Sequence, residues 1–312
     1  MNKNNSPVFI VAPVRSGSTL LRLMLDSHPI ITNPGECDFL FDLISDDGQY
    51  PDVNVYHEWL SLNRIFQSKK LKVDENLNYP ELMNSFIKQF SHDNTVLSLN
   101  VHRHFHRIPK VFSNARYIHL LRDPRDVARS CMRMGWVGNV YYGIDIWEEA
   151  EKSWGHLKKT LPSSQYIEIK YENLLDDIEK GLTIICEFLG VEYSKGMMDY
   201  AKDSTYDLPN KNLCYQWKTK YSKRELQLVE GRVSKMLLAR GYELSGYSSI
   251  QPSSFEKFIL MIKNKTFRIR HQINKYGLRL YVKKTIANKL GISRWRNECV
   301  HRINVIDIKG LK

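Results

Sequence analysis

Short apolar runs alternate with amphipathic segments along the first 250 residues of the chain. Four runs have the length and composition of buried strands, and they span 8–12, 95–99, 116–121 and 166–169. Apolar residues recur at helical spacing in the segments 19–27, 145–161, 176–189 and 222–240, and in a segment that begins at 124. This alternation predicts an α/β fold, in which a parallel sheet has helices on both faces and binds ligands at the carboxyl ends of its strands.

The first strand–helix junction has the pattern of a phosphate-binding loop. It reads Ala12-Pro13-Val14-Arg15-Ser16-Gly17-Ser18-Thr19-Leu20. Backbone N–H groups in such a loop point at one spot, and the helix N-terminus adds partial positive charge. The spacing is that of a Walker loop, but Ala12 replaces its first glycine and Ser18 replaces its lysine. A P-loop nucleotide kinase needs that lysine, so this alternative is weakened but stays open.

A second junction of the same kind follows the strand 116–121. There Arg122 leaves the strand, Asp123 can cap the next helix and Pro124 suits its first position. Ser130 lies two turns into that helix and can face back toward Arg122, so the pair can grip a second phosphate. The competing interpretation is an Arg–Asp surface pair that only caps the helix.

Together the two junctions resemble the PAPS-dependent sulfotransferase family, in its bacterial type and near its tyrosylprotein branch. The first loop resembles the family's RSGTT segment, and Arg122 with Ser130 resembles its 3′-phosphate site. The likeness continues at Lys170-Tyr171-Glu172-Asn173-Leu174, at Asp203-Ser204-Thr205 and at Gln216-Trp217-Lys218, over about residues 8 to 242. It implies a P-loop-like sheet that binds 3′-phosphoadenosine 5′-phosphosulfate (PAPS) and releases PAP without a metal. The residues that it places at this nucleotide are Arg15, Ser16, Gly17, Ser18, Thr19, Leu20, Arg122, Ser130, Tyr171, Ser204 and Lys218.

The resemblance also suggests a general base. Some branches carry a Gly-Glu pair after the first helix, which here is Gly35-Glu36. A carboxylate can take the proton of an acceptor hydroxyl, especially if burial raises its pKa, so Glu36 is our candidate base and Arg15 stabilises charge on the leaving phosphate. Where many relatives have a lysine, this chain has a His/Arg cluster over 102–107. His102 or His104 is therefore the alternative base, and His102 or Arg103 can instead support the leaving group.

The predicted reaction is O-sulfation, in which PAPS gives its sulfuryl group to an acceptor hydroxyl. We expect the acceptor to be a carbohydrate; a peptide tyrosine, a lipid and a small-molecule hydroxyl stay open. A module that binds PAPS or PAP without transferring sulfate is a further alternative. The HxHxH spacing of 102–106 resembles a metal tract, but a strand-end segment without carboxylates does not favour a metal site.

Composition indicates where the protein works. The five cysteines are an odd number, widely spaced and without a CxxC pair, which favours free thiols in a reducing compartment. The sequence shows neither a long apolar span nor a signal-peptide pattern, so we expect a cytoplasmic protein.

The formal net charge of +12 resides in the last 62 residues. Residues 251–312 hold 15 Lys and Arg against 3 Asp and Glu, whereas residues 1–250 hold 31 of each. We therefore expect a sulfotransferase domain over 1–250 and a basic amphipathic helical extension over 251–312. The extension suits the anionic inner face of a membrane, and equally a helix pair on the core or a homodimer contact. No readout motif favours nucleic acid as a partner.

Overall fold

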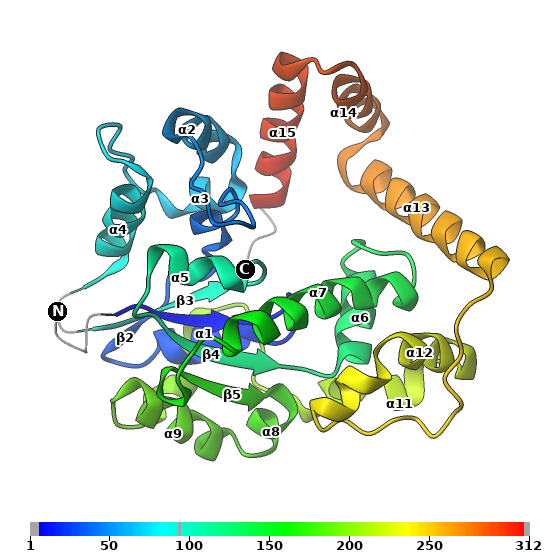
Figure 1. The fold of residues 1–312 in the computed structure, drawn as a ribbon, viewed down its shortest axis with the longest axis horizontal. Coiled ribbons are helices and arrows are strands. Elements are labelled where there is room, and N and C mark those ends of the chain that lie inside the picture. Colours follow the sequence, from blue (N-terminus) through cyan, green and yellow to red (C-terminus); the bar gives the residue numbers. More distant parts are fainter. Residues whose placement is uncertain (1–5, 93–94, 309–312) are drawn as a thin grey trace.

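The computed structural model describes residues 6–92 and 95–308, and its centre is a parallel sheet of five strands (Figure 1). The strand order is β2-β3-β1-β4-β5, and every pairing is parallel. The strands are β1 (Val8–Val11), β2 (Ile31–Thr32), β3 (Val96–Val101), β4 (Arg116–Leu121) and β5 (Tyr166–Lys170). Four of them are the predicted strands. The fifth, β2, has two residues and was not predicted, because so short a run has no recognisable alternation.

Alternate residues of the central strand serve two separate apolar cores. Phe9 and Val11 pack on one face of the sheet, and Val8 and Ile10 pack on the other. The first face is covered by α2 (Val53–Leu62), α3 (Arg64–Lys69), α4 (Tyr79–Phe90), α5 (Ile108–Val111) and the end of α7 (Val140–Lys158). The second is covered by α1 (Ser18–Asp26), α8 (Tyr171–Asp176), α9 (Ile178–Leu189) and α10 (Tyr200–Asp203). The predicted α/β fold with helices on both faces is confirmed.

A third apolar cluster lies beyond the carboxyl end of β4. It joins α6 (Pro124–Arg133), the start of α7 and α12 (Lys223–Ala239), while α11 (Trp217–Lys220) contacts α6. Helix α7 begins at Val140, five residues before the predicted start, because the Asn139 side chain accepts a hydrogen bond from the Tyr142 N–H. This cluster fixes α6, which carries Ser130, against the sheet.

The C-terminal extension is helical, as predicted, and it forms three helices. They are α13 (Ser254–Tyr276), α14 (Leu278–Leu290) and α15 (Ser293–Ile308), separated by glycines with positive φ at Gly277 and Gly291. Figure 1 shows them in orange to red, as an arch that leaves α12 and returns beside α2 and α3. Within the described residues, no helix combines the length and the apolar character needed to cross a membrane.

Candidate active site

The loop between β1 and α1 makes a tight turn. Arg15 and Gly17 both have left-handed backbone angles, with φ of 70° and 91°. Gly17 precedes the first residue of α1, so the loop's N–H groups meet the positive end of that helix. The Ser16 hydroxyl is buried and has no hydrogen-bond partner among the described residues. A buried polar group without a partner costs free energy, and an anionic ligand in this loop would supply the partner.

Tyr171 closes one side of this loop. A Cβ atom on Gly17 would lie 2.3 Å from the Tyr171 ring, so only glycine allows the ring to pack here. The guanidinium carbon of Arg122 lies 4.5 Å from the centre of the same ring. Tyr171 therefore connects the first loop to the end of β4.

The two arginines that follow β4 have different surroundings. Arg125 is buried, and its guanidinium donates to Asp123 and Glu230 at 2.7 Å each. Arg122 instead donates to two backbone carbonyls, those of Arg15 at 2.9 Å and Leu213 at 2.7 Å. The Arg–Asp pair at this helix is thus formed by Arg125, and it is internal. Among the described residues no carboxylate pairs with the Arg122 guanidinium, which lies beside the first loop.

The two predicted anion segments meet in space. The Nε of Arg15 donates to the Oγ of Ser130 at 3.0 Å, and the Arg15 carbonyl accepts from Arg122. All three residues therefore belong to one site at the carboxyl ends of β1 and β4. The sequence predicted each segment, and the sheet order makes them neighbours because β1 pairs with β4.

Two further donors that are unpartnered among the described residues, on α6 and at the start of α11, were not identified from the sequence. The Nε of Arg129 and the Nε1 of Trp217 are buried without a hydrogen-bond partner in the described part of the chain, as is the Nε of Arg122. Neighbouring positions of a helix point about 100° apart, so the place of Arg129 directly before Ser130 gave no signal for it. Register alone does not tell which of several arginines on α6 faces the ligand side.

Glu36 and His102 face each other at the carboxyl end of β3. The His102 Nε2 lies 3.7 Å from a Glu36 carboxylate oxygen, and its Nδ1 lies 3.0 Å from the Ala12 carbonyl. The backbone of Glu36 also bridges to Asn100 on β3. The Gly-Glu segment and the end of β3 thus come together next to the first loop, which begins at Ala12.

Charge determines the protonation state of this pair. The adjacent His102 ring, with Arg64 and Lys69 further out, lowers the pKa of Glu36 to about 2, against the opposing effect of burial. Burial alone would lower the pKa of His102, but Glu36 and Asp38 raise it to about 9. Burial therefore does not raise the pKa of Glu36 on balance, because a cation faces the carboxylate. At neutral pH Glu36 is ionised and His102 is protonated, so Glu36 is the group able to accept a proton.

Arg103, His106 and Arg107 of the His/Arg cluster have structural partners. Arg103 donates to both carboxylate oxygens of Asp42, at 2.7 and 2.6 Å. His106 lies 3.0 Å from the Ser153 hydroxyl, and burial lowers the pKa of His104. No three His, Cys, Asp or Glu side chains within 6–92 and 95–308 are arranged to hold a metal ion.

The contacts given below for Ser204 and Lys218 are with residues outside the two loops. The Ser204 hydroxyl accepts from the Tyr206 N–H at 3.2 Å. The Lys218 ammonium is exposed and lies 5.2 Å from the centre of the Tyr215 ring. Their roles at a nucleotide stay predictions.

Comparison with known proteins agrees with this geometry. The sequence profile of the sulfotransferase family matches residues 7–195, which is more than half of the chain. An uncharacterized protein of Aquifex aeolicus (strain VF5) is 22% identical over 219 residues; the match covers 63% of this chain and only 27% of that relative. The chain thus spans about a quarter of the length of this relative.

Solved structures share the fold. The sulfotransferase domain from the curacin biosynthetic pathway is 18% identical, with a TM-score of 0.57; the match covers 77% of this chain and 98% of that domain. The sulfotransferase domain of the olefin synthase of Synechococcus PCC 7002 is 24% identical, with a TM-score of 0.51, over 73% of this chain and 94% of that domain.

Proposed function

Because the chain belongs to the sulfotransferase family, we propose that it moves a sulfuryl group from PAPS to an acceptor hydroxyl and releases PAP. The observation that carries this proposal is the junction of Arg15, Ser130 and Arg122, which gathers two phosphate-type segments into one site. A nucleotide with phosphates at both ends needs two such segments. A P-loop kinase needs a lysine where this chain has Ser18, so its case is weaker.

The donors present fit the phosphates of PAPS. The Ser16 hydroxyl, the Arg122 Nε and the Arg129 Nε are buried and unpartnered among the described residues, and each can donate to a phosphate or sulfate oxygen. Arg15 and the N-terminus of α1 would hold the phosphosulfate end. Arg122 and Ser130 would hold the 3′-phosphate, and this remote binding would fix the position of the sulfur.

Glu36 is the proposed general base. The acceptor oxygen forms a bond to sulfur, the bond from sulfur to the phosphate oxygen breaks, and Glu36 accepts the hydroxyl proton. His102 is a positioning residue, since it fixes the carboxylate and keeps it ionised. The positive charge of Arg15 and the loop N–H groups stabilises the charge that develops on the departing phosphate.

We propose a glycan as the acceptor. The side chain of Glu36 is 42% exposed, so a large substrate can reach it from solvent. The nearby charges of Arg64 and Lys69 suit a glycan that carries acidic groups. Aromatic side chains give little support, because Trp147 and Trp154 are fully buried in the cores rather than presented to a sugar. All five cysteines are unpaired, which fits a reaction in the cytoplasm.

The test is incubation of the full chain with labelled PAPS and a panel of acidic and neutral glycans, tyrosine peptides and hydroxyl-bearing lipids. We expect label on an acidic glycan and stoichiometric PAP. Label on a peptide or lipid alone would overturn the acceptor, and tight PAP binding with no transfer to any acceptor would indicate a binding module. ATP turnover with magnesium in place of sulfuryl transfer would support the kinase.

A further inference from the structure

Helix α13 contacts the catalytic domain through one side only. The Leu260 carbonyl accepts from the Asn139 side chain at 2.8 Å, and Asn264 accepts from the Gly138 N–H at 2.7 Å. Phe267 lies against the same glycine. Leu260, Asn264 and Phe267 are spaced by four and three positions, so they share one face of the helix. That face covers the turn between α6 and α7.

The opposite face of α13 carries a stripe of exposed apolar side chains. Phe255, Phe258 and Ile262 are spaced by three and four positions, and helical register places them on the side away from the docked face. They are 72%, 53% and 45% exposed. A stripe of large exposed apolar side chains on an otherwise polar surface is typical of a site that contacts a protein, a membrane or a ligand.

The charge around this stripe selects the kind of partner. Residues 251–312 hold 15 Lys and Arg against 3 Asp and Glu. Lys263, Lys265 and Arg270 are exposed on the same helix. A second copy of the chain would bring an equally basic surface against this one and be repelled, whereas an anionic partner would be attracted. A nucleic acid would satisfy the charges but would leave the phenylalanine and isoleucine side chains without an apolar environment.

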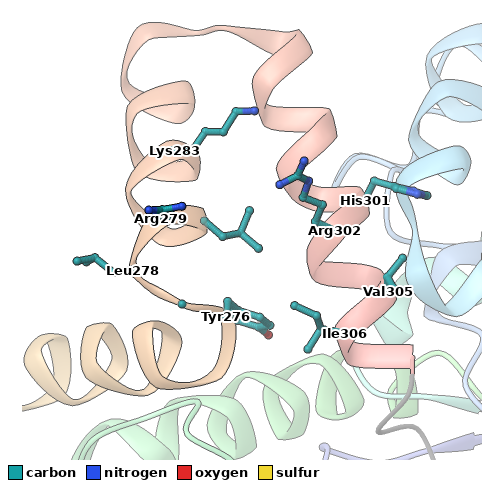
Figure 2. Close-up of a pocket in the computed structure, with 10 residues that line it drawn as sticks. Tyr276, Leu278, Arg279, Lys283, His301, Arg302, Val305 and Ile306 are labelled. Carbon is teal, nitrogen blue, oxygen red and sulfur yellow. The ribbon is translucent and has the colours of Figure 1, made fainter.

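Apolar and cationic side chains also lie together at the far end of the arch. A pocket of about 750 Å³ lies between α14 and α15. Figure 2 shows Tyr276 and Ile306 pointing toward one another at its base, with Arg302 projecting from α15 toward α14 above them. Its walls are mostly apolar, and Arg279, Lys283 and Arg302 lie around them; Lys283 and Arg302 both pair with Glu298, whereas Arg279 has no carboxylate partner among the described residues. Apolar space beside cations suits an amphipathic anion, such as a phospholipid.

We propose that α13–α15 form a docking surface for a bilayer that contains anionic phospholipids. The Phe255, Phe258 and Ile262 side chains enter the headgroup region, and the flanking lysines and arginines contact lipid phosphates. The docking surface also adjoins the acceptor side of the proposed active site. Asp307 of α15 lies 3.7 Å from Arg64, one of the charges that act on Glu36. Membrane-held acceptors would therefore be presented close to Glu36, a consequence that rests on the proposed function, whereas the docking itself does not.

The experiment is flotation of the full chain with vesicles, without PAPS. Vesicles of phosphatidylcholine and phosphatidylglycerol in equal parts should carry the protein, vesicles of phosphatidylcholine alone should not, and added salt should weaken binding. A triple variant with Phe255→Gln, Phe258→Gln and Ile262→Gln should bind the anionic vesicles at least about tenfold more weakly. Glutamine favours helix, and circular dichroism verifies that the variant stays folded.

Matched controls lie outside the arch. Leu238→Gln removes an exposed apolar side chain of α12, and Lys180→Glu reverses an exposed charge of α9; both should bind as the wild type does, whereas Lys265→Glu should bind more weakly. Equal binding of the triple variant, or no binding to anionic vesicles, would overturn the proposal. Binding to single-stranded nucleic acid in its place would assign the surface to that partner, and a dimer that the triple variant dissociates would assign it to a second copy. Sulfuryl transfer to a water-soluble acceptor is measured separately. A failure of the proposed function is therefore distinguishable from a failure of membrane docking.

Discussion

Arg15 donates from its Nε to the Oγ of Ser130 at 3.0 Å, although 115 positions separate them in the sequence. The bond joins the loop after β1 to the second turn of α6. The backbone carbonyl of Arg15 accepts from Arg122, so the loop is held from the end of β4 as well. Each of the predictions on nucleotide binding tests this junction.

Removing the proposed base should separate chemistry from binding. Glu36→Gln keeps the size of the side chain but cannot accept a proton at neutral pH, so transfer should fall by about 10² to 10⁴-fold. PAP affinity, measured by calorimetry, should change little, because we propose that Glu36 faces the acceptor and not the nucleotide. If the variant transfers at the wild-type rate, the base is elsewhere, and His102 and His104 are the next residues to change.

Substitution of the proposed phosphate-binding residues should weaken PAP binding, which the change at Glu36 should not. Arg122→Ala and Ser130→Ala each remove a donor, and PAP affinity should drop by about 1 to 3 kcal/mol, more for the arginine. The matched control is Arg224→Ala, which removes an arginine whose partner is Glu256 on the surface. Unchanged PAP affinity in Arg122→Ala would place the 3′-phosphate at another site.

Gly17 should tolerate no side chain. Alanine there must adopt a φ of 91° and meet the Tyr171 ring, so we expect a loss of about 1 to 3 kcal/mol in unfolding free energy together with weaker PAP binding. Gly190→Ala is the control, since Gly190 has a φ of 80° and no atom within 4 Å of the added Cβ. Equal losses in both variants on urea denaturation would show that contact with Tyr171 contributes nothing.

The His102 charge should stabilise the fold in a defined pH range. Because its folded pKa is about 9 and its ordinary value is 6.5, its contribution is complete below 6.5 and is lost as the pH rises through about 9. The melting temperatures of wild type and His102→Gln should therefore differ most near neutral or mildly acidic pH and converge above about 9. The reciprocal check is an NMR titration of Glu36→Gln, in which the pKa of His102 should fall. A constant gap across this range would contradict the ion pair.

Arg125 should matter for stability far more than its place in the nucleotide-binding segment suggests. Arg125→Met leaves Asp123 and Glu230 buried without their cation, and unfolding free energy should fall by about 3 to 5 kcal/mol. Lys152→Met removes only an exposed pair with Glu148 and should cost less than about 1 kcal/mol. Similar losses from both variants in chemical denaturation would indicate that water reaches Arg125.

Most of the fold could be predicted from the sequence, whereas the binding roles of the two anion segments stay predictions. Local signals sufficed where they are strong: the Asp123 cap and Pro124 start α6 as expected, and four strands lie where the apolar runs predict. Contacts between residues that are far apart in the sequence could not be predicted. The sequence does not state which of Arg122 and Arg125 is turned inward, since that choice depends on Glu230, 105 positions away. It also does not place His102 opposite Glu36, so the lowered pKa of this carboxyl group could not be predicted.

The basic arch is fastened at both ends. Asn264 holds it to Gly138 in the turn before α7, and Asn304 donates to the Leu62 carbonyl at 2.8 Å, near Arg64. A shortened chain that stops at residue 250 would uncover the turn before α7 and the seam of α2 and α3 at once. Such a fragment would be poorer material for assay or crystallisation than its intact sheet suggests, and a protease that nicks one loop of the arch would leave both pieces attached.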